Sequence, residues 1–227
     1  MIPRVCISIH PKTITEALSL IDRAEQAGAN IIEVRLDGIQ KHERLTELAE
    51  HGSLQKIATN KLKRYRGQFK GSEHEQKQIL LRAARDGFEY VDIELSATNL
   101  REFTTEVSEQ GAKPIVSYHE FDHSLEIAEL SKVLEQEIAS GAETCKIVTT
   151  VNSIEDNLTL LNFAATACKK TNLVCFAMGE SGKISRLLSP LFGCSFTFAA
   201  LEIGRESASG QMTIQEMRTS YKLLGLR

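Results

Sequence analysis

The sequence of 227 residues lacks any apolar run that approaches the ~20 residues needed to span a bilayer. It also lacks an excess of either charge, because 27 Lys and Arg residues stand against 30 Asp and Glu residues. The chain therefore shows no electrostatic footprint for nucleic acid or for an anionic membrane. Its hydrophobic content of 42% is too high for a disordered chain. We expect a globular protein that binds neither nucleic acid nor a membrane.

Cysteine is sparse and shows no motif. The five cysteines, Cys6, Cys145, Cys168, Cys175 and Cys194, are odd in number and widely spaced, with no CxxC pair. This pattern predicts neither a disulfide framework nor a zinc site. Cys6, Cys145 and Cys175 lie among apolar, β-branched residues, where a free cysteine packs as a small hydrophobe. The N-terminal sequence MIPRVCISIHPK lacks the longer apolar core of a secretory signal, so we expect a cytoplasmic location.

Short runs rich in Val, Ile and Phe alternate with longer segments of helical periodicity along the whole chain. The predicted strands are residues 4–9, 31–36, 56–59, 90–95, 114–118, 144–149, 173–178 and 196–201. Glycines that can close a helix in the left-handed conformation stand before several of these strands: Gly28, Gly52, Gly87, Gly111 and Gly141. The sequence therefore predicts a repeated βα unit.

Continuous apolar strands alternating with amphipathic helices indicate a parallel sheet covered by helices. Eight such units in a chain of this length favour a closed (β/α)8 TIM barrel over an open sheet. The main alternative, a Rossmann-type fold, is disfavoured because no GxGxxG follows the first strand. No low-complexity linker interrupts the alternation, and the basic segment 61–71 has the position of a βα loop. We expect a single domain over residues 1–227.

The chemistry of a barrel lies at the C-terminal ends of its strands. The second predicted strand ends in EVRLD, and alternation directs Glu33, Arg35 and Asp37 to the same side. Charged residues in an apolar run are costly unless they are paired, hydrated or used in a site. A structural ion pair and a functional role both remain open for this segment.

The fifth predicted strand ends in SYHEFD, which places Ser117 and His119 on one face, with His119 at the rim. Imidazole titrates near neutral pH, so it can accept a proton and return it to a bound substrate. A single histidine at such a position is also compatible with a purely structural role.

The sixth predicted strand, TCKIVTT, carries Lys146 within an apolar run. A long cation is not expected there unless it faces a cavity. Burial and neighbouring cations lower the pKa of a lysine, and a neutral amine can attack a ketone to form an iminium. The alternative is a lysine that extends from the strand end to solvent.

The segment after the seventh predicted strand, MGESGKISRLLSPLFG, begins with Met178 and carries Arg186 in a helix. A glycine-bearing loop followed by a helix can hold an anion, and an arginine can bind it bidentately. Phosphate binding is the general alternative for a barrel loop at this point. The last loop, SASGQ from Ser207 to Gln211, has the small polar residues of a mobile lid, although a surface turn has a similar composition.

Together these segments resemble type I 3-dehydroquinate dehydratase. The resemblance rests on EVRLD, the histidine of SYHEF, CKI with its lysine twenty-seven residues after that histidine, MGxxGxISR and SASGQ, which occur in this order. It runs from the first predicted strand to the last helix. The family has the (β/α)8 fold, in agreement with the alternation described above.

The resemblance implies dehydration of 3-dehydroquinate to 3-dehydroshikimate in the shikimate pathway of aromatic amino-acid biosynthesis, without a metal or another cofactor. Lys146 would form a Schiff base with the C3 ketone of this small-molecule substrate. His119 would abstract the C2 proton and deliver a proton to the departing C1 hydroxyl. The family usually forms homodimers, and we expect the same here.

The resemblance also implies a set of substrate contacts. Glu33 and Arg35 would contact the substrate hydroxyls, and Arg186 would bind its carboxylate. Ser207 and Gln211 would belong to the closing loop, and Met178 would form an apolar wall beside the imine.

Three positions depart from the family pattern. Lys61 stands where the family has an arginine, and a lysine supplies charge without a bidentate fork. Tyr65 stands where the family has the glutamate that assists the catalytic histidine. Ser209 replaces the usual proline of the lid, so we expect lid closure to cost more entropy and substrate affinity to be weakened.

Two other functions stay open at this point. A class I aldolase would use the same lysine to cleave a carbon–carbon bond, but aldolases of phosphorylated sugars need a phosphate site, and a single arginine suits a carboxylate better. A catalytically inactive barrel could serve as a binding module. That alternative gives no reason for keeping costly polar groups at the strand ends.

Overall fold

The computed structural model describes residues 3–226, and eight parallel strands form one sheet in it. The strands are β1 (Val5–Ile9), β2 (Ile31–Arg35), β3 (Lys56–Thr59), β4 (Tyr90–Glu94), β5 (Lys113–His119), β6 (Thr144–Thr150), β7 (Asn172–Met178) and β8 (Thr197–Ala200). Each predicted strand is found, within two residues at either end. The alternation of short apolar runs and amphipathic segments is therefore confirmed as βα repetition.

Eight α-helices follow the strands in turn within the described residues. They are α1 (Ile14–Gln26), α2 (Leu45–Glu50), α3 (Glu73–Arg85), α4 (Leu100–Glu109), α5 (Ile127–Ala139), α6 (Asp156–Ala167), α7 (Lys183–Leu188) and α8 (Ile214–Leu223). Short 3-10 turns add η1 (Leu36–Gly38), η2 (Lys63–Tyr65), η3 (Glu180–Gly182) and η4 (Ser189–Phe192). Among residues 3–226, no helix has both the length and the apolar character to cross a membrane.

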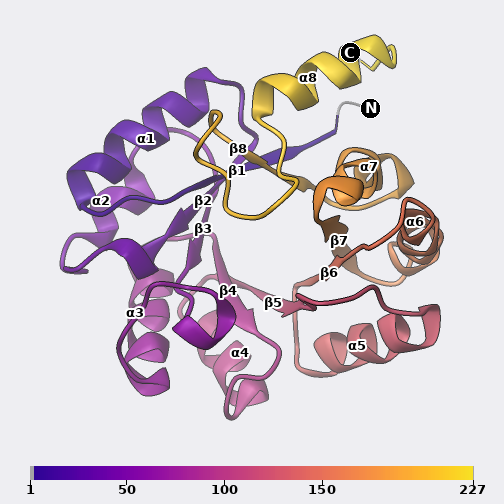
Figure 1. The fold of residues 1–227 in the computed structure, drawn as a ribbon. Coiled ribbons are helices and arrows are strands. Elements are labelled where there is room, and N and C mark those ends of the chain that lie inside the picture. Colours follow the sequence, from indigo (N-terminus) through magenta and orange to yellow (C-terminus); the bar gives the residue numbers. More distant parts are fainter. Residues whose placement is uncertain (1–2, 227) are drawn as a thin grey trace.

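The sheet curls into a barrel with the helices around it (Figure 1). Its strand order is β7-β6-β5-β4-β3-β2-β1-β8, so β7 and β8 are the two strands that meet at the seam. One backbone hydrogen bond, from the Ser195 amide to the Leu173 carbonyl at 2.8 Å, joins the two sides just before β8. The (β/α)8 prediction is confirmed, and the Rossmann alternative is wrong.

Local sequence signals explain how these elements begin and end. The Thr13 side chain accepts a hydrogen bond from the Glu16 amide and caps α1, and Ser72 and Glu75 form a capping box at α3. The five glycines predicted to close helices all have positive φ: Gly28, Gly52, Gly87, Gly111 and Gly141. The sequence therefore predicts where each of these helices ends and the chain turns toward the next strand.

The interior of the barrel is divided into two levels. Its lower level is apolar and includes Cys6, Ile31, Ile57 and Ile115, whereas polar side chains fill the level toward the C-terminal ends of the strands. Cys6, like Cys145 and Cys175, is a buried free thiol, as predicted, and burial raises the pKa of Cys145 to about 12. The apolar level seals the barrel below the polar one.

Candidate active site

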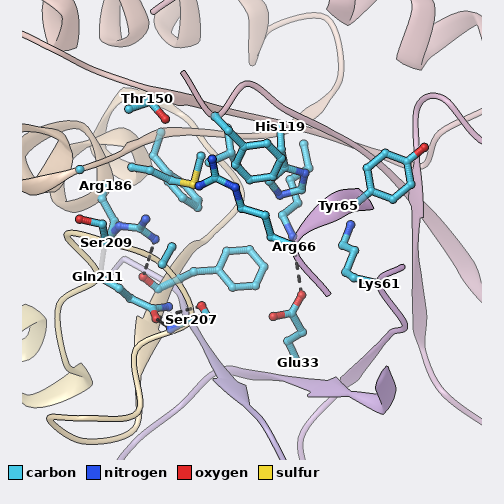
Figure 2. A pocket seen from close by; sticks show the side chains of 18 of the residues that line it. Glu33, Lys61, Tyr65, Arg66, His119, Thr150, Arg186, Ser207, Ser209 and Gln211 are labelled. Carbon is cyan, nitrogen blue, oxygen red and sulfur yellow. Dashed lines mark hydrogen bonds and ion pairs between the residues drawn. The ribbon is translucent and has the colours of Figure 1, made fainter. Parts of the chain in front are cut away.

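A cavity of about 310 Å³ opens at the C-terminal ends of the strands (Figure 2). All nine residues that the sequence predicted for the site line it: Glu33, Arg35, Lys61, His119, Lys146, Met178, Arg186, Ser207 and Gln211. Tyr65 and Ser209, two of the positions that depart from the family pattern, line it as well. The fold therefore gathers residues that lie up to 178 positions apart, from 33 to 211, around one space.

Strand register explains why charged side chains meet above the apolar level. Ser8 is paired with Glu33 between β1 and β2, and Ser117 is paired with Lys146 between β5 and β6. Side chains two residues apart on a strand point to the same face. The inward face of each strand thus changes from apolar to polar toward its C-terminal end.

Lys146 points into the cavity and is only 5% exposed. Its Nζ donates a hydrogen bond to Oδ2 of Asp92 at 2.9 Å and lies 3.6 Å from Oε1 of Glu33. It also lies 4.4 Å from the centroid of the Phe198 ring. Two carboxylates and an aromatic face therefore surround the one amine, and the side chain does not extend to solvent.

Sequence reasoning missed Asp92 and Glu94, which β4 places beside the lysines. Both alternate inward along the strand YVDIE, and this carboxylate pair in an apolar run was the available signal. Oδ1 of Asp92 accepts a hydrogen bond from Lys61 at 2.5 Å, while Oδ2 binds Lys146. Burial alone would raise the pKa of Asp92, but Lys146 and Lys61 hold it well below its usual range. Asp92 is thus an ionised carboxylate shared by two lysines.

The ammonium of Lys61 is fully occupied by neighbouring groups. It donates to Asp92, to Glu94 and, at 3.0 Å, to the hydroxyl of Ser117. An ammonium has three hydrogens to donate, so these contacts use all of them. Although burial opposes the charged form, Asp92 and Glu94 raise the pKa of Lys61. It is a permanent cation that holds the two carboxylates of β4 in place.

His119 ends β5 beside Glu94. Its Nδ1 lies 3.7 Å from Oε2 of Glu94, and its ring is stacked on Phe121 with centroids 5.8 Å apart at 11°. Burial lowers the pKa of His119, Glu94 opposes this, and Lys61 adds to the lowering. The imidazole is therefore neutral at neutral pH and can accept a proton.

Tyr65 is not placed to act on the imidazole as a carboxylate would. Its hydroxyl is hydrogen-bonded to the hydroxyl of Ser96. The carboxylate beside His119 comes instead from Glu94 on the neighbouring strand. The glutamate absent at position 65 thus has a counterpart that the sequence pattern did not reveal.

The charged residues of β2 divide into two groups. Glu33 accepts hydrogen bonds from the hydroxyls of Ser8 and Thr59, and although burial opposes ionisation, Lys146 and Arg35 lower its pKa. Arg35 forms a bidentate ion pair with Asp37, at 2.7 and 2.8 Å. Asp37 lies on η1 beyond the end of β2, and it is absent from the cavity lining. The expected ion pair is therefore found for Arg35, whereas Glu33 lies in the cavity beside Lys146 and stays a candidate for a functional role.

Arg186 lies at the seam of the barrel and is 1% exposed. Its Nη1 donates to the Phe198 carbonyl on β8 and its Nη2 to the Ala177 carbonyl on β7, each at 3.4 Å. Its guanidinium carbon lies 4.2 Å from the centroid of the Phe176 ring, and Nε has no hydrogen-bond partner within residues 3–226. Burial lowers the pKa of Arg186 to about 9, so it is still cationic at neutral pH. A buried cation held only by carbonyls and a ring is suited to an anionic ligand.

The loop between β8 and α8 covers one side of the cavity. Oε1 of Gln211 accepts hydrogen bonds from the amide and the hydroxyl of Ser207, at 2.6 and 2.9 Å. The Gly179 amide donates to the carbonyl of Ser209 at 3.0 Å. A proline at position 209 would offer the same backbone carbonyl, so the serine found there makes this hydrogen bond equally well. The loop is closed on the end of β7.

Comparisons with known proteins agree on one family. The sequence model described as type I 3-dehydroquinase matches residues 5–227. A 3-dehydroquinate dehydratase of Dehalococcoides mccartyi is 37% identical over 221 residues, which cover 97% of this chain and 96% of the relative. One of Methanococcus maripaludis is 32% identical over 223 residues, covering 97% of this chain and 100% of the relative. The crystal structure of 3-dehydroquinate dehydratase from Geobacillus kaustophilus is similar with a TM-score of 0.90 and 26% identity, covering 98% of this chain and 91% of that one.

Proposed function

This chain belongs to the type I 3-dehydroquinase family, and we propose that it dehydrates 3-dehydroquinate to 3-dehydroshikimate through a Schiff base on Lys146. The family assignment makes it an enzyme of the 3-dehydroquinate dehydratase class, which acts in the shikimate pathway. The family assignment therefore excludes the class I aldolases as the family of this chain. The observation that carries the mechanism is the buried amine of Lys146 between two ionised carboxylates, with a neutral histidine in the same cavity.

In the first step the Lys146 ammonium gives up a proton to His119, and the amine so formed attacks the C3 ketone. The carbonyl oxygen takes that proton back together with one from the nitrogen and leaves as water, which restores neutral His119. The product is an iminium, so the positive charge stays at the nitrogen. Asp92 and Glu33 lie at 2.9 and 3.6 Å from this nitrogen, and the face of Phe198 lies at 4.4 Å. Fixed negative charge and an aromatic face stabilise this cation without reorganisation of solvent.

In the second step the iminium acts as an electron sink, and neutral His119 removes a proton from C2. The resulting enamine expels the C1 hydroxyl, which takes the proton from the imidazolium and leaves as water. Glu94 stabilises the imidazolium during this exchange because its carboxylate lies 3.7 Å from Nδ1. Addition of water to the conjugated iminium releases the enone and returns Lys146 as its ammonium.

The remaining site residues position the substrate in this proposal. Arg186 binds its carboxylate, and Glu33 and Arg35 contact its hydroxyls. Met178 forms an apolar wall beside the imine, while Ser207 and Gln211, on the loop after β8, exclude water from the cavity. Lys61 also lines the cavity, but its three hydrogens are committed. We therefore expect Lys61 to act on substrate through Asp92 and Glu94 rather than by direct contact.

Borohydride trapping tests the proposal. The protein is incubated with 3-dehydroquinate and borohydride, and the adduct is mapped by peptide mass spectrometry. We expect a reduced adduct on the peptide that contains Lys146, and enone absorbance in the untreated sample. Lys146→Met should lose the adduct and turnover together, whereas Lys183→Met, which removes an exposed lysine outside the cavity, should lose neither. Turnover by Lys146→Met at the wild-type rate would refute the imine. Absence of both enone and adduct in the wild type would favour a non-catalytic barrel.

We also propose that this protein forms a homodimer and that it is located in the cytoplasm. The dimer follows from the family resemblance, and light scattering after size exclusion tests it. A mass of one chain at micromolar concentration would contradict it. Fractionation of cells of the source organism, followed by immunoblotting, tests the location.

A further inference from the structure

Arg66 lies at the mouth of the cavity and takes no part in the mechanism above. It follows η2, and Figure 2 shows its side chain in front of His119. Its backbone has φ 57° and ψ 24°, in the left-handed region that glycine adopts readily and L side chains rarely do. A strained residue retained at a ligand cavity indicates a role for its side chain.

The turn around Arg66 fixes this conformation. The Arg66 amide donates to the Lys63 carbonyl, and the Gly67 amide to the Leu62 carbonyl, each at 3.0 Å. A Cβ on Gly67 would lie 1.9 Å from the Lys61 carbonyl oxygen, so the turn is packed directly against the end of β3. The position of Arg66 is therefore set by backbone contacts and not by the exposed side chain.

The guanidinium of Arg66 is held by a ring and retains free donors. Its central carbon lies 4.1 Å from the centroid of Phe121, which is itself stacked on His119. The nearest carboxylate, that of Asp122, is 4.0 Å away, and the two side chains are 64% and 87% exposed. Such a pair is weak. Stacking on a ring leaves the N–H groups at the guanidinium edge available to a ligand.

Arg66 also changes the charge of the cavity. Three carboxylates in or beneath the cavity, Glu33, Asp92 and Glu94, are paired with Lys61 and Lys146, and Arg186 lies at the seam. Arg35 is neutralised by Asp37, and His119 is uncharged at neutral pH. Arg66 therefore adds an exposed positive charge at the mouth of the cavity, where it has only the weak pair with Asp122.

We propose that Arg66 is a specificity-determining residue, whose guanidinium on Phe121 attracts an anionic substrate to the cavity mouth and donates hydrogen bonds to its carboxylate on entry. The inference rests on the function proposed above, which supplies the carboxylate-bearing substrate. It assigns to Arg66 the capture of the anion and to Arg186 its final binding. Arg66 should consequently affect substrate binding more than the chemical steps.

Steady-state kinetics of Arg66→Gln and Arg66→Lys test this assignment. At low ionic strength we expect Arg66→Gln to raise KM by about tenfold while kcat stays within about twofold, because uniform binding is lost. Arg66→Lys keeps the charge and should recover most of the loss. At an ionic strength of about 0.5 M the difference between Arg66→Gln and the wild type should shrink to about twofold, since salt screens the exposed charge.

Two further variants separate binding from folding. Arg64 lies in the same turn and is paired with Glu73 at 2.5 Å, but it does not line the cavity. Arg64→Gln removes the same charge and should leave KM within about twofold of the wild type. Arg66→Gly relieves the backbone strain and should unfold at the wild-type temperature or above, with KM raised as in Arg66→Gln.

The methyl ester of 3-dehydroquinate provides a final comparison, since it lacks the anionic group. With the ester, Arg66→Gln and wild type should have the same kcat/KM. An unchanged KM in Arg66→Gln at low salt, an equal change in Arg64→Gln, or a loss confined to kcat would each overturn the inference. Lack of turnover by the wild type would instead reject the proposed function, so the two failures are distinguishable.

Discussion

Replacing Glu94 by glutamine tests how this chain controls its histidine. The change removes the negative charge that lies 3.7 Å from Nδ1 of His119 but keeps an oxygen that can accept from the ring. Two isolated charges at this separation interact by about 4 kcal/mol at an effective dielectric constant of about 20. Lys61 is bound to the same carboxylate and cancels a large part of this interaction. We take roughly a third, about 1.4 kcal/mol, as the remainder, which equals about one pKa unit.

The direction of the effect follows from the surroundings of His119. Its pKa is already below 6.5, mainly because of burial, and Glu94 opposes that lowering. Without the carboxylate the pKa falls further. Because the neutral imidazole is the active base, kcat/KM is lost as pH falls through this pKa. The acid limb should therefore move about one unit toward lower pH in Glu94→Gln. The plateau value of kcat should fall about tenfold, since the imidazolium formed in the transition state loses the same free energy.

The assay is the enone absorbance of the product, followed between about pH 4 and pH 8 at constant ionic strength. Glu120→Gln is the matched control, because Glu120 follows His119 directly but contacts Tyr118 and His123 and does not line the cavity. This control should leave the acid limb in place. An acid limb that is unchanged in Glu94→Gln, or that moves to higher pH, would refute the assignment of Glu94 as the carboxylate that supports the histidine.

Three other substitutions give distinct outcomes. Arg186→Met should raise KM by about 100-fold, because a charge-assisted bidentate contact with the substrate carboxylate is lost. The melting temperature of the protein should also fall, because Arg186 bridges the two strands at the barrel seam. An unchanged KM would show that Arg186 does not bind the substrate carboxylate. Gly210 has φ +73°, and the Cβ of an alanine there would lie 1.9 Å from the Gly179 carbonyl oxygen. In Gly210→Ala we therefore expect steady-state kinetics to show kcat/KM lowered at least tenfold, and circular dichroism to show little change in the melting temperature. Tyr65→Phe removes only the hydroxyl that bonds Ser96, so kcat and the acid limb should stay within about twofold and a few tenths of a pH unit; a larger change would show that Tyr65 acts on His119.

Local sequence signals were sufficient for the barrel and for most of its site. Alternation of apolar and amphipathic segments predicts the strands, and left-handed glycines such as Gly28 mark the ends of helices, because both depend on contacts within a few residues. The ends of parallel strands meet at one edge of a barrel. Lys146, His119 and Glu33 could therefore be assigned to a common cavity before any coordinates were known.

Tertiary structure decided how the charges are paired. Asp92 and Glu94 are visible in the sequence as two carboxylates in an apolar strand, but only strand order places them between Lys61, Lys146 and His119. The same is true of Lys61, whose three hydrogens go to groups at least 31 residues away.

Arg66 shows the same division between sequence and structure. Its residue type is visible in the sequence, but its left-handed backbone and its position over Phe121 arise from a turn packed against β3. A sequence pattern records which side of a strand a residue faces. Coulomb interactions depend on distances between strands, and those distances are fixed only when the barrel closes.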